Sequence, residues 1–388
     1  MPLVPLSGPA EVLMASLRAE RVTQAEAQLA IERFLHACAG LSIEARQIQF
    51  DSLLGVVDES PTGPACFLSV VCGALLEQGA TPGRMGAIVH RLLSELLPPA
   101  SYLIRESKKR EDAAVPPTRL MTGDEADEYE SQLQTQLFEE VSAANPLARE
   151  AWDNLGAFWP ACVALYSRQV PARVKAREFM PLVNTLAERH EGGHWLRKLL
   201  PVLDNEPLVV IDPSRSTGIV ARMSGVADNF QLHTLLMHHF PRRWYERQRV
   251  RETAVAVATG HGAQQTPEVI TGSWNLYQAA ALGLDGHIAR AQRTHARHWI
   301  WGEGVPTDLS MVDGHRVVLL GSVSHVRTWP SARLFGSLKA GLQEVQRLDQ
   351  TGVGAWLRQL VAALPKSQGI TEPEKPQESV TSVQHAQC

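Results

Sequence analysis

The stretch His190-Glu191-Gly192-Gly193-His194 is the only short motif in this chain that matches a named chemistry. Two histidines four residues apart lie on the same face of an α-helix, where both rings can bind one Zn²⁺. The glutamate after the first histidine would then lie beside the metal-bound water as its general base. The pattern therefore predicts a zinc-type hydrolytic site with His190 and His194 as ligands and Glu191 as the base.

Two features of the same stretch argue against this interpretation. The pair Gly192-Gly193 would cost about 2 kcal/mol in a helix interior relative to alanines, and paired glycines are typical of a helix end. The extended zinc-protease motif also fails, because Arg197 and Leu200 stand where its glycine and third histidine belong. The alternative is one helix that ends at the glycines and a second that begins near His194. If a metal is bound, the candidates for the third ligand are His233, Glu303 and Asp308.

A second group of chemistry-bearing residues lies in two tryptophan-rich segments, 272–277 and 298–308. Alternation along a strand would place Trp274 and Leu276 on the face opposite Asn275. If the two segments pair, aromatic and polar side chains meet at one end of a sheet, which is the composition of a ligand pocket. The candidate ligand-binding residues are Trp274, Asn275, Tyr277, Trp299, Trp301 and Asp308.

Three functions follow from these patterns. The first is an enzyme that uses zinc or another divalent metal, with hydrolysis as its reaction. The second is a non-catalytic protein that holds a small molecule or peptide in the tryptophan-rich pocket. The third is a metal-free enzyme in which Glu303 and His298 do acid–base chemistry. A purely structural alternative is a half-buried sheet whose aromatic side chains cover a helical layer.

The composition is that of a folded protein with little charge bias. The chain has 388 residues, 44% of them apolar and 20% charged, with a formal net charge of −4. This balance argues against nucleic acid or an anionic membrane as a partner. Because no glycine-rich phosphate-binding motif occurs, no nucleotide cofactor is expected. Five cysteines without a CxxC pair, and an N-terminus without a signal-peptide pattern, lead us to expect a cytoplasmic location.

The first half of the chain has helical periodicity. It predicts a helical domain over residues 1–104, which could bind a protein partner, with one helix at 82–97 ended by Pro98-Pro99. The charged, proline-bearing stretch 105–121 is expected to be a linker or exposed loop. Residues 122–206 are expected to form a helical segment that packs on the C-terminal domain.

The pattern changes near residue 207. Two β-branched runs, 207–212 and 219–225, flank turn residues and predict a hairpin, and Asp228 or Asn229 is a natural cap for a following helix. The sequence thus predicts an α+β fold: a helical N-terminal half followed by a mixed, mostly antiparallel sheet packed with helices. Further elements are expected as helices at 230–240, 243–259 and 341–363, as strands at 268–278, 298–301 and 315–320, as an α+β domain over 207–365, and as a disordered tail over 366–388.

Overall fold

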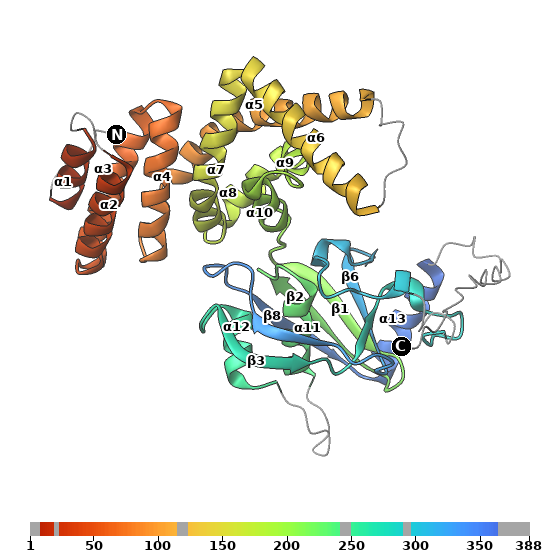
Figure 1. Ribbon diagram of the computed structural model, residues 1–388. Coiled ribbons are helices and arrows are strands. Elements are labelled where there is room, and N and C mark those ends of the chain that lie inside the picture. The colour runs from red at the N-terminus through yellow and green to blue at the C-terminus, as the bar shows by residue number, and fades with distance from the viewer. Residues whose placement is uncertain (1–7, 19–22, 115–122, 241–249, 290–295, 364–388) are drawn as a thin grey trace, which may run out of the picture.

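The structure is a computed structural model that describes residues 8–18, 23–114, 123–240, 250–289 and 296–363. Its fold is α+β, with a helical N-terminal half and a C-terminal part built on a sheet (Figure 1). The helices of the first half are α1 (Pro9–Leu17), α2 (Gln24–Ala39), α3 (Ile43–Glu59), α4 (Thr62–Glu77), α5 (Met85–Ala113), α6 (Gly123–Ala144), α7 (Pro146–Tyr166), α8 (Val170–Ala176), η1 (Arg177–Phe179), α9 (Met180–Leu186) and α10 (Glu191–Leu199).

The helical half is held by close packing of α4 on α7. A Cβ atom added at Gly73 of α4 would lie 3.1 Å from Ala161 Cα of α7, so the glycine lets the two backbones approach. Burial beside this contact raises the pKa of the Cys66 and Cys72 thiols to about 12, the behaviour of unreactive core residues. The apolar core of this half is therefore close-packed, with small side chains at the helix crossing.

Helix α5 corrects two predictions. It runs through Pro98-Pro99 to Ala113, so the helix does not end at the prolines, and residues 105–113 are helical instead of forming a linker. The prolines remove two helical hydrogen bonds, but apolar side chains before and after them are buried on one face. That continuous face, which packs on α7 and α9, outweighs the local cost. The rest of the expected linker, residues 115–121, lies outside the described residues.

The C-terminal part is built on a mixed sheet with strand order β4-β6-β1-β2-β8, in which β5 pairs with β6. Among the strand pairs in the described residues, β1–β6 alone is parallel, so the sheet is mostly antiparallel, as predicted. A separate two-stranded sheet joins β3 and β7. The strands are β1 (Glu206–Asp212), β2 (Thr217–Ser224), β3 (Gln265–Thr271), β4 (Asn275–Tyr277), β5 (Met311–Val312), β6 (His315–Gly321), β7 (Thr328–Ala332) and β8 (Gly341–Leu348).

Helices cover both faces of the main sheet. Helices α11 (Asn229–His239) and α12 (Glu252–Thr259) share an apolar core with one face of β1, and α13 (Gln350–Ala363) covers the other face. The expected hairpin is confirmed, with Val209 opposite Val220 in an antiparallel register. Both faces of β1 are buried, which explains its continuous apolar run. The described part of the expected helix 243–259 is α12, and the expected tail 366–388 lies outside the described residues.

Three predicted elements differ in the structure. The expected strand 298–301 is reduced to a single bridge between Trp299 and Tyr277, directly after the 3₁₀ turn Ala296–His298. Residues 341–348 form the edge strand β8 instead of the start of a helix. Leu342, Val345 and Leu348 stand three apart and mimic a helical stripe, but Val345 is 60% exposed on the strand. The segment 268–278 is not one strand, because it divides between β3 and β4, which belong to different sheets.

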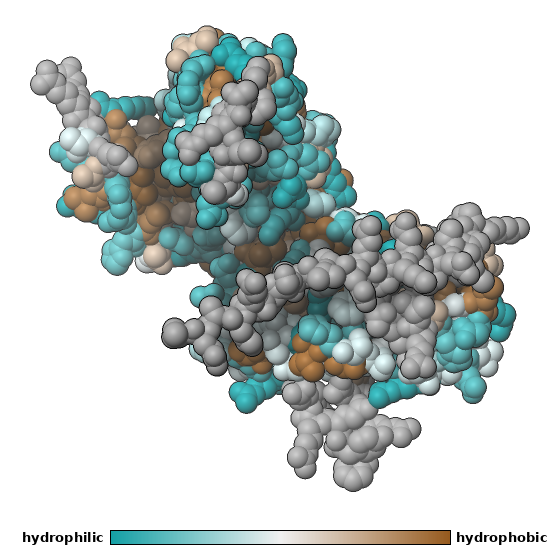
Figure 2. Space-filling view, turned by 45° about the vertical axis from the view of Figure 1, so that its right-hand side comes forward, coloured by the Kyte–Doolittle hydropathy of each residue, from teal (hydrophilic) through white to brown (hydrophobic). Residues whose placement is uncertain are grey.

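The two parts of the molecule meet at α10 and the segment before β8. The ring of Trp195 in α10 lies 6.0 Å from that of Phe335, and Arg168 donates a 3.2 Å hydrogen bond to Ser337. Among the described helices, none is long and apolar enough to cross a membrane. On the face shown in Figure 2, hydrophilic residues predominate and hydrophobic ones form separate patches.

Candidate functional site

The predicted zinc-binding helix is interrupted at its first histidine. Helix α10 begins at Glu191, and His190 is its N-cap residue with extended backbone. The Nδ1 atom of His190 accepts a 3.3 Å hydrogen bond from Gly193 N–H, and its Nε2 atom, 3.1 Å from the Trp152 carbonyl oxygen, donates to it. The prediction that His190 and His194 share one face of a continuous helix is therefore wrong.

Both glycines of the motif have a packing role. A Cβ at Gly192 would lie 2.9 Å from Trp159 Cβ, and a Cβ at Gly193 would lie 2.7 Å from Leu186 Cβ. The glycines thus let α10 turn closely against α7 and α9. Glu191 is exposed and accepts a 3.4 Å hydrogen bond from Trp195. In the part of the chain that the structure describes, no three His, Cys, Asp or Glu side chains are grouped to hold a metal ion.

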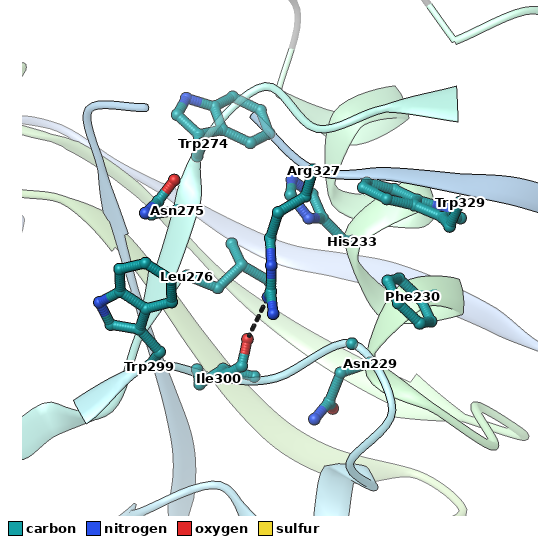
Figure 3. A pocket seen from close by; sticks show the side chains of 11 residues that line it. Asn229, Phe230, His233, Trp274, Asn275, Leu276, Trp299, Ile300, Arg327 and Trp329 are labelled. Atoms are coloured by element: carbon teal, nitrogen blue, oxygen red, sulfur yellow. Dashed lines mark hydrogen bonds between the residues drawn. The ribbon is translucent and has the colours of Figure 1, made fainter. Parts of the chain in front are cut away.

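The tryptophan-rich segments do come together. Residues Tyr277 and Trp299 form an antiparallel bridge, and Ile300 N–H donates a 2.9 Å hydrogen bond to the Leu276 carbonyl. Beside this bridge a narrow crevice opens between β4 and the start of α11 (Figure 3). Its free volume of about 10 Å³ has room for about one water molecule. It is lined by Asn229, Phe230, His233, Trp274, Asn275, Leu276, Trp299, Ile300, Gly302, Arg327 and Trp329.

The crevice gathers some of the predicted site residues and leaves out others. Trp274, Asn275 and Trp299 line it, together with His233, which was expected as a metal ligand. Tyr277 instead belongs to the core under α13 on the opposite face of the sheet. The lining also excludes three exposed residues, Trp301, Glu303 and Asp308. It excludes His298 too, which is buried and whose Nε2 accepts a hydrogen bond from Arg297.

The N-terminus of α11 fixes one wall of the crevice. Asp228 caps the helix by accepting a 2.7 Å hydrogen bond from Gln231 N–H, as predicted, and burial raises its carboxyl pKa. The backbone N–H groups of the first turn, which have no partner within the helix, bind the loop that follows Trp301. The backbone N–H of Asn229 donates to the Gly304 carbonyl, and that of Phe230 donates to the Gly302 carbonyl. The loop is thereby held against the helix.

Two buried acceptors in the lining have no partner. Asn229 and Asn275 are each 3% exposed. The Nδ2 atom of Asn229 donates to the Trp301 carbonyl at 2.9 Å, and that of Asn275 to Ser324 Oγ at 2.9 Å. Their Oδ1 atoms accept no hydrogen bond from the described residues. Buried polar atoms are nearly always satisfied, so two unsatisfied acceptors around one crevice require an explanation.

Arg327 is one of the lining residues that the sequence did not predict. In Figure 3 its side chain crosses the middle of the crevice, with Trp299 on one side and Phe230 on the other. The guanidinium carbon lies 4.5 Å from the ring centre of Trp301 and 5.8 Å from that of Trp299. One guanidinium nitrogen makes a long, 3.5 Å hydrogen bond to the Ile300 carbonyl. Arg327 stands directly before β7, a strand that the sequence pattern did not indicate.

A wider groove of about 570 Å³ lies at the end of the sheet near the β1–β2 turn. Its buried carboxylate, Asp212, accepts from the backbone and hydroxyl of Ser214 and from the Arg215 N–H. These bonds, all to Oδ1, form an Asx turn within the hairpin, and Oδ2 lies 3.6 Å from Arg215 Nε, so both carboxylate oxygens of Asp212 have partners within the turn.

Comparison of the chain with family models, with curated proteins and with solved structures finds no match.

Proposed function

We propose that this protein is a ligand-binding protein whose crevice between α11 and β4 holds a small molecule or a peptide side chain. The observation that carries the proposal is the pair of unpartnered oxygens, Asn229 Oδ1 and Asn275 Oδ1, in one aromatic lining. Each buried acceptor without a donor costs about 1–3 kcal/mol. A ligand with an N–H or O–H group that reaches one of these atoms would satisfy it and recover that free energy.

The lining favours binding over catalysis. Most of its side chains are aromatic, aliphatic or amide. His233 and Arg327 are the two lining side chains that can carry a charge. A general acid–base pair needs two groups that exchange protons near neutral pH, and arginine does not lose its proton in that range. The two groups expected for metal-free chemistry, Glu303 and His298, do not line the crevice.

A thermal-shift experiment on the full chain tests the proposal. Amino acids, amines, nucleosides and short peptides would each be added at about 1 mM to the wild type and to Asn275→Leu, which removes the acceptor at similar volume. The control is Asn184→Leu at an exposed position of α9. We expect at least one compound to raise the melting temperature of the wild type and the control but not of Asn275→Leu. A panel in which no compound distinguishes Asn275→Leu would contradict the proposal.

A further inference from the structure

We infer that the crevice takes a cationic group with N–H donors, a guanidinium or an ammonium, and that Arg327 fills this place as an internal occupant. The inference rests on the proposed function and adds the class of ligand to it. Three features of the crevice carry it: the surroundings of the Arg327 charge, the balance of donors and acceptors in the lining, and the space available.

The Arg327 charge lies against aromatic rings and a carbonyl group. In the described part of the chain, no carboxylate oxygen lies within 4.0 Å of its guanidinium nitrogens. Its partners are the ring faces of Trp301 and Trp299 and the Ile300 carbonyl oxygen. A cation over the face of a tryptophan gains about 0.5–2 kcal/mol. The crevice therefore already accepts a positive charge by means of rings and a carbonyl group.

Apart from Arg327 and His233, the open hydrogen-bonding capacity of the lining side chains lies in acceptors. Three of its donors are paired, because the side-chain N–H groups of Asn229, Asn275 and Trp329 donate to Trp301, Ser324 and Thr234. The two asparagine oxygens are among the lining atoms that accept no hydrogen bond from the described residues, and the Ile300 carbonyl accepts the long bond from Arg327. An anionic group would face these oxygens unfavourably, whereas a cation with several N–H groups matches them.

A ligand must displace the Arg327 side chain, because about one water molecule fits while that side chain is in place. The backbone of Arg327 is fixed, since its carbonyl accepts a 2.9 Å hydrogen bond from Gly272 N–H. The side chain alone can rotate outward, past the exposed residues 322–326. Arg327 thus competes with an external cation as a tethered ligand at an effective concentration on the order of millimolar.

Chemical rescue of Arg327→Ala tests the inference. The probes are methylguanidinium, its neutral analogue methylurea, and acetate, each added to full-length protein and followed by thermal shift and calorimetry. We expect methylguanidinium to bind Arg327→Ala about tenfold or more tightly than the wild type, because the tethered competitor is gone. Methylurea should have no effect. Trp301→Ala combined with Arg327→Ala should abolish the binding, and the control Arg358→Ala, at an exposed position of α13, should behave as the wild type.

Two results would overturn the inference. One is stabilisation of the wild type by acetate that disappears in Arg327→Ala, which would make Arg327 the contact for an anion. The other is an equal response of all variants to methylguanidinium. Should Arg327→Ala fail to fold, Arg327→Gln keeps the side-chain stem and loses the charge, and the same comparison applies. The proposed function fails separately. If a neutral or anionic compound binds and its binding depends on Asn275, the proposed function stands and the inferred cationic ligand class is wrong.

Discussion

One guanidinium nitrogen of Arg173 lies 2.6 Å from both carboxylate oxygens of Asp204, where the helical half passes into β1. The Arg173 side chain is 1% exposed and that of Asp204 is 21% exposed. A second arginine, Arg177, donates to the carbonyls of Leu200 and Val202 in the same segment. The two arginines thus fix the direction in which the chain enters the sheet.

Removal of the Asp204 charge should destabilise the protein strongly. Asp204→Asn leaves the Arg173 cation buried with a neutral partner, and loss of one member of a buried pair costs about 3–5 kcal/mol. We expect the free energy of unfolding to fall by about 3 kcal/mol, the lower end of this range, because Asp204 is partly exposed. Denaturant unfolding measures it. The control is Asp58→Asn in the surface pair Arg84–Asp58, where about 0–1 kcal/mol is expected. Equal losses in the two variants would contradict the role of the buried pair.

The crevice should also be sensitive to a single methyl group at Gly302. A Cβ at this position would lie 2.1 Å from a ring atom of Phe230, so this lining side chain must shift and change the shape of the crevice. Gly302→Ala is expected to lower the free energy of unfolding by about 1–3 kcal/mol. It should also abolish any ligand binding that depends on Asn275. Gly341→Ala, at a site with nothing within 4 Å, is the matched control and should be silent. Unchanged binding in Gly302→Ala would mean that the ligand does not use this crevice.

Stability should fall at mildly acidic pH through His190. Burial lowers the pKa of this histidine below its ordinary value of 6.5, so the unfolded chain takes up the proton first. The contribution of the neutral His190 ring to the free energy of unfolding is fully present above pH 6.5 and is lost as the pH falls through the folded-state pKa. His190→Asn keeps an N-cap acceptor and removes the titration, so its melting temperature should fall less on acidification. The exposed control His36→Asn should retain the wild-type slope, and an unchanged slope in His190→Asn would be the adverse result.

The metal prediction can be checked by elemental analysis of protein purified without chelators. Both ring nitrogens of His190 are hydrogen-bonded to backbone groups, so a metal could bind this ring only after breaking one of those bonds. We expect His194→Ala to leave the metal content unchanged. Stoichiometric zinc that is lost in His194→Ala would restore the zinc-type hydrolytic function and require His190 to rotate away from the cap.

The fold class was predictable because local patterns determine much of it. The hairpin of β1 and β2 and the Asp228 cap follow from β-branched runs and from a side chain suited to the first turn of a helix. The continuation of α5 through Pro98-Pro99 depends instead on packing against distant helices, which no local pattern contains. Strand β8 was missed for the same reason, since its partner β2 is remote in sequence.

The site was predictable in part. Trp274, Asn275 and Trp299 could be found from tryptophan-rich segments that alternate like strands. Arg327 could not, because its role depends on rings contributed by another segment and its own sequence surroundings carry no motif. The continuous helix through His190 and His194 was predicted wrongly for a chemical reason: a histidine nitrogen can accept a hydrogen bond at an N-cap, and His190 lies before α10 and caps it in this way.

The most direct test is a crystal structure of Arg327→Ala soaked with methylguanidinium. Density for the ion over the Trp301 ring, with nitrogens directed at the Ile300 carbonyl and at one of the asparagine oxygens, is the predicted result. An empty crevice in crystals where the ion binds elsewhere, or a crevice closed by the tryptophan rings, would contradict it.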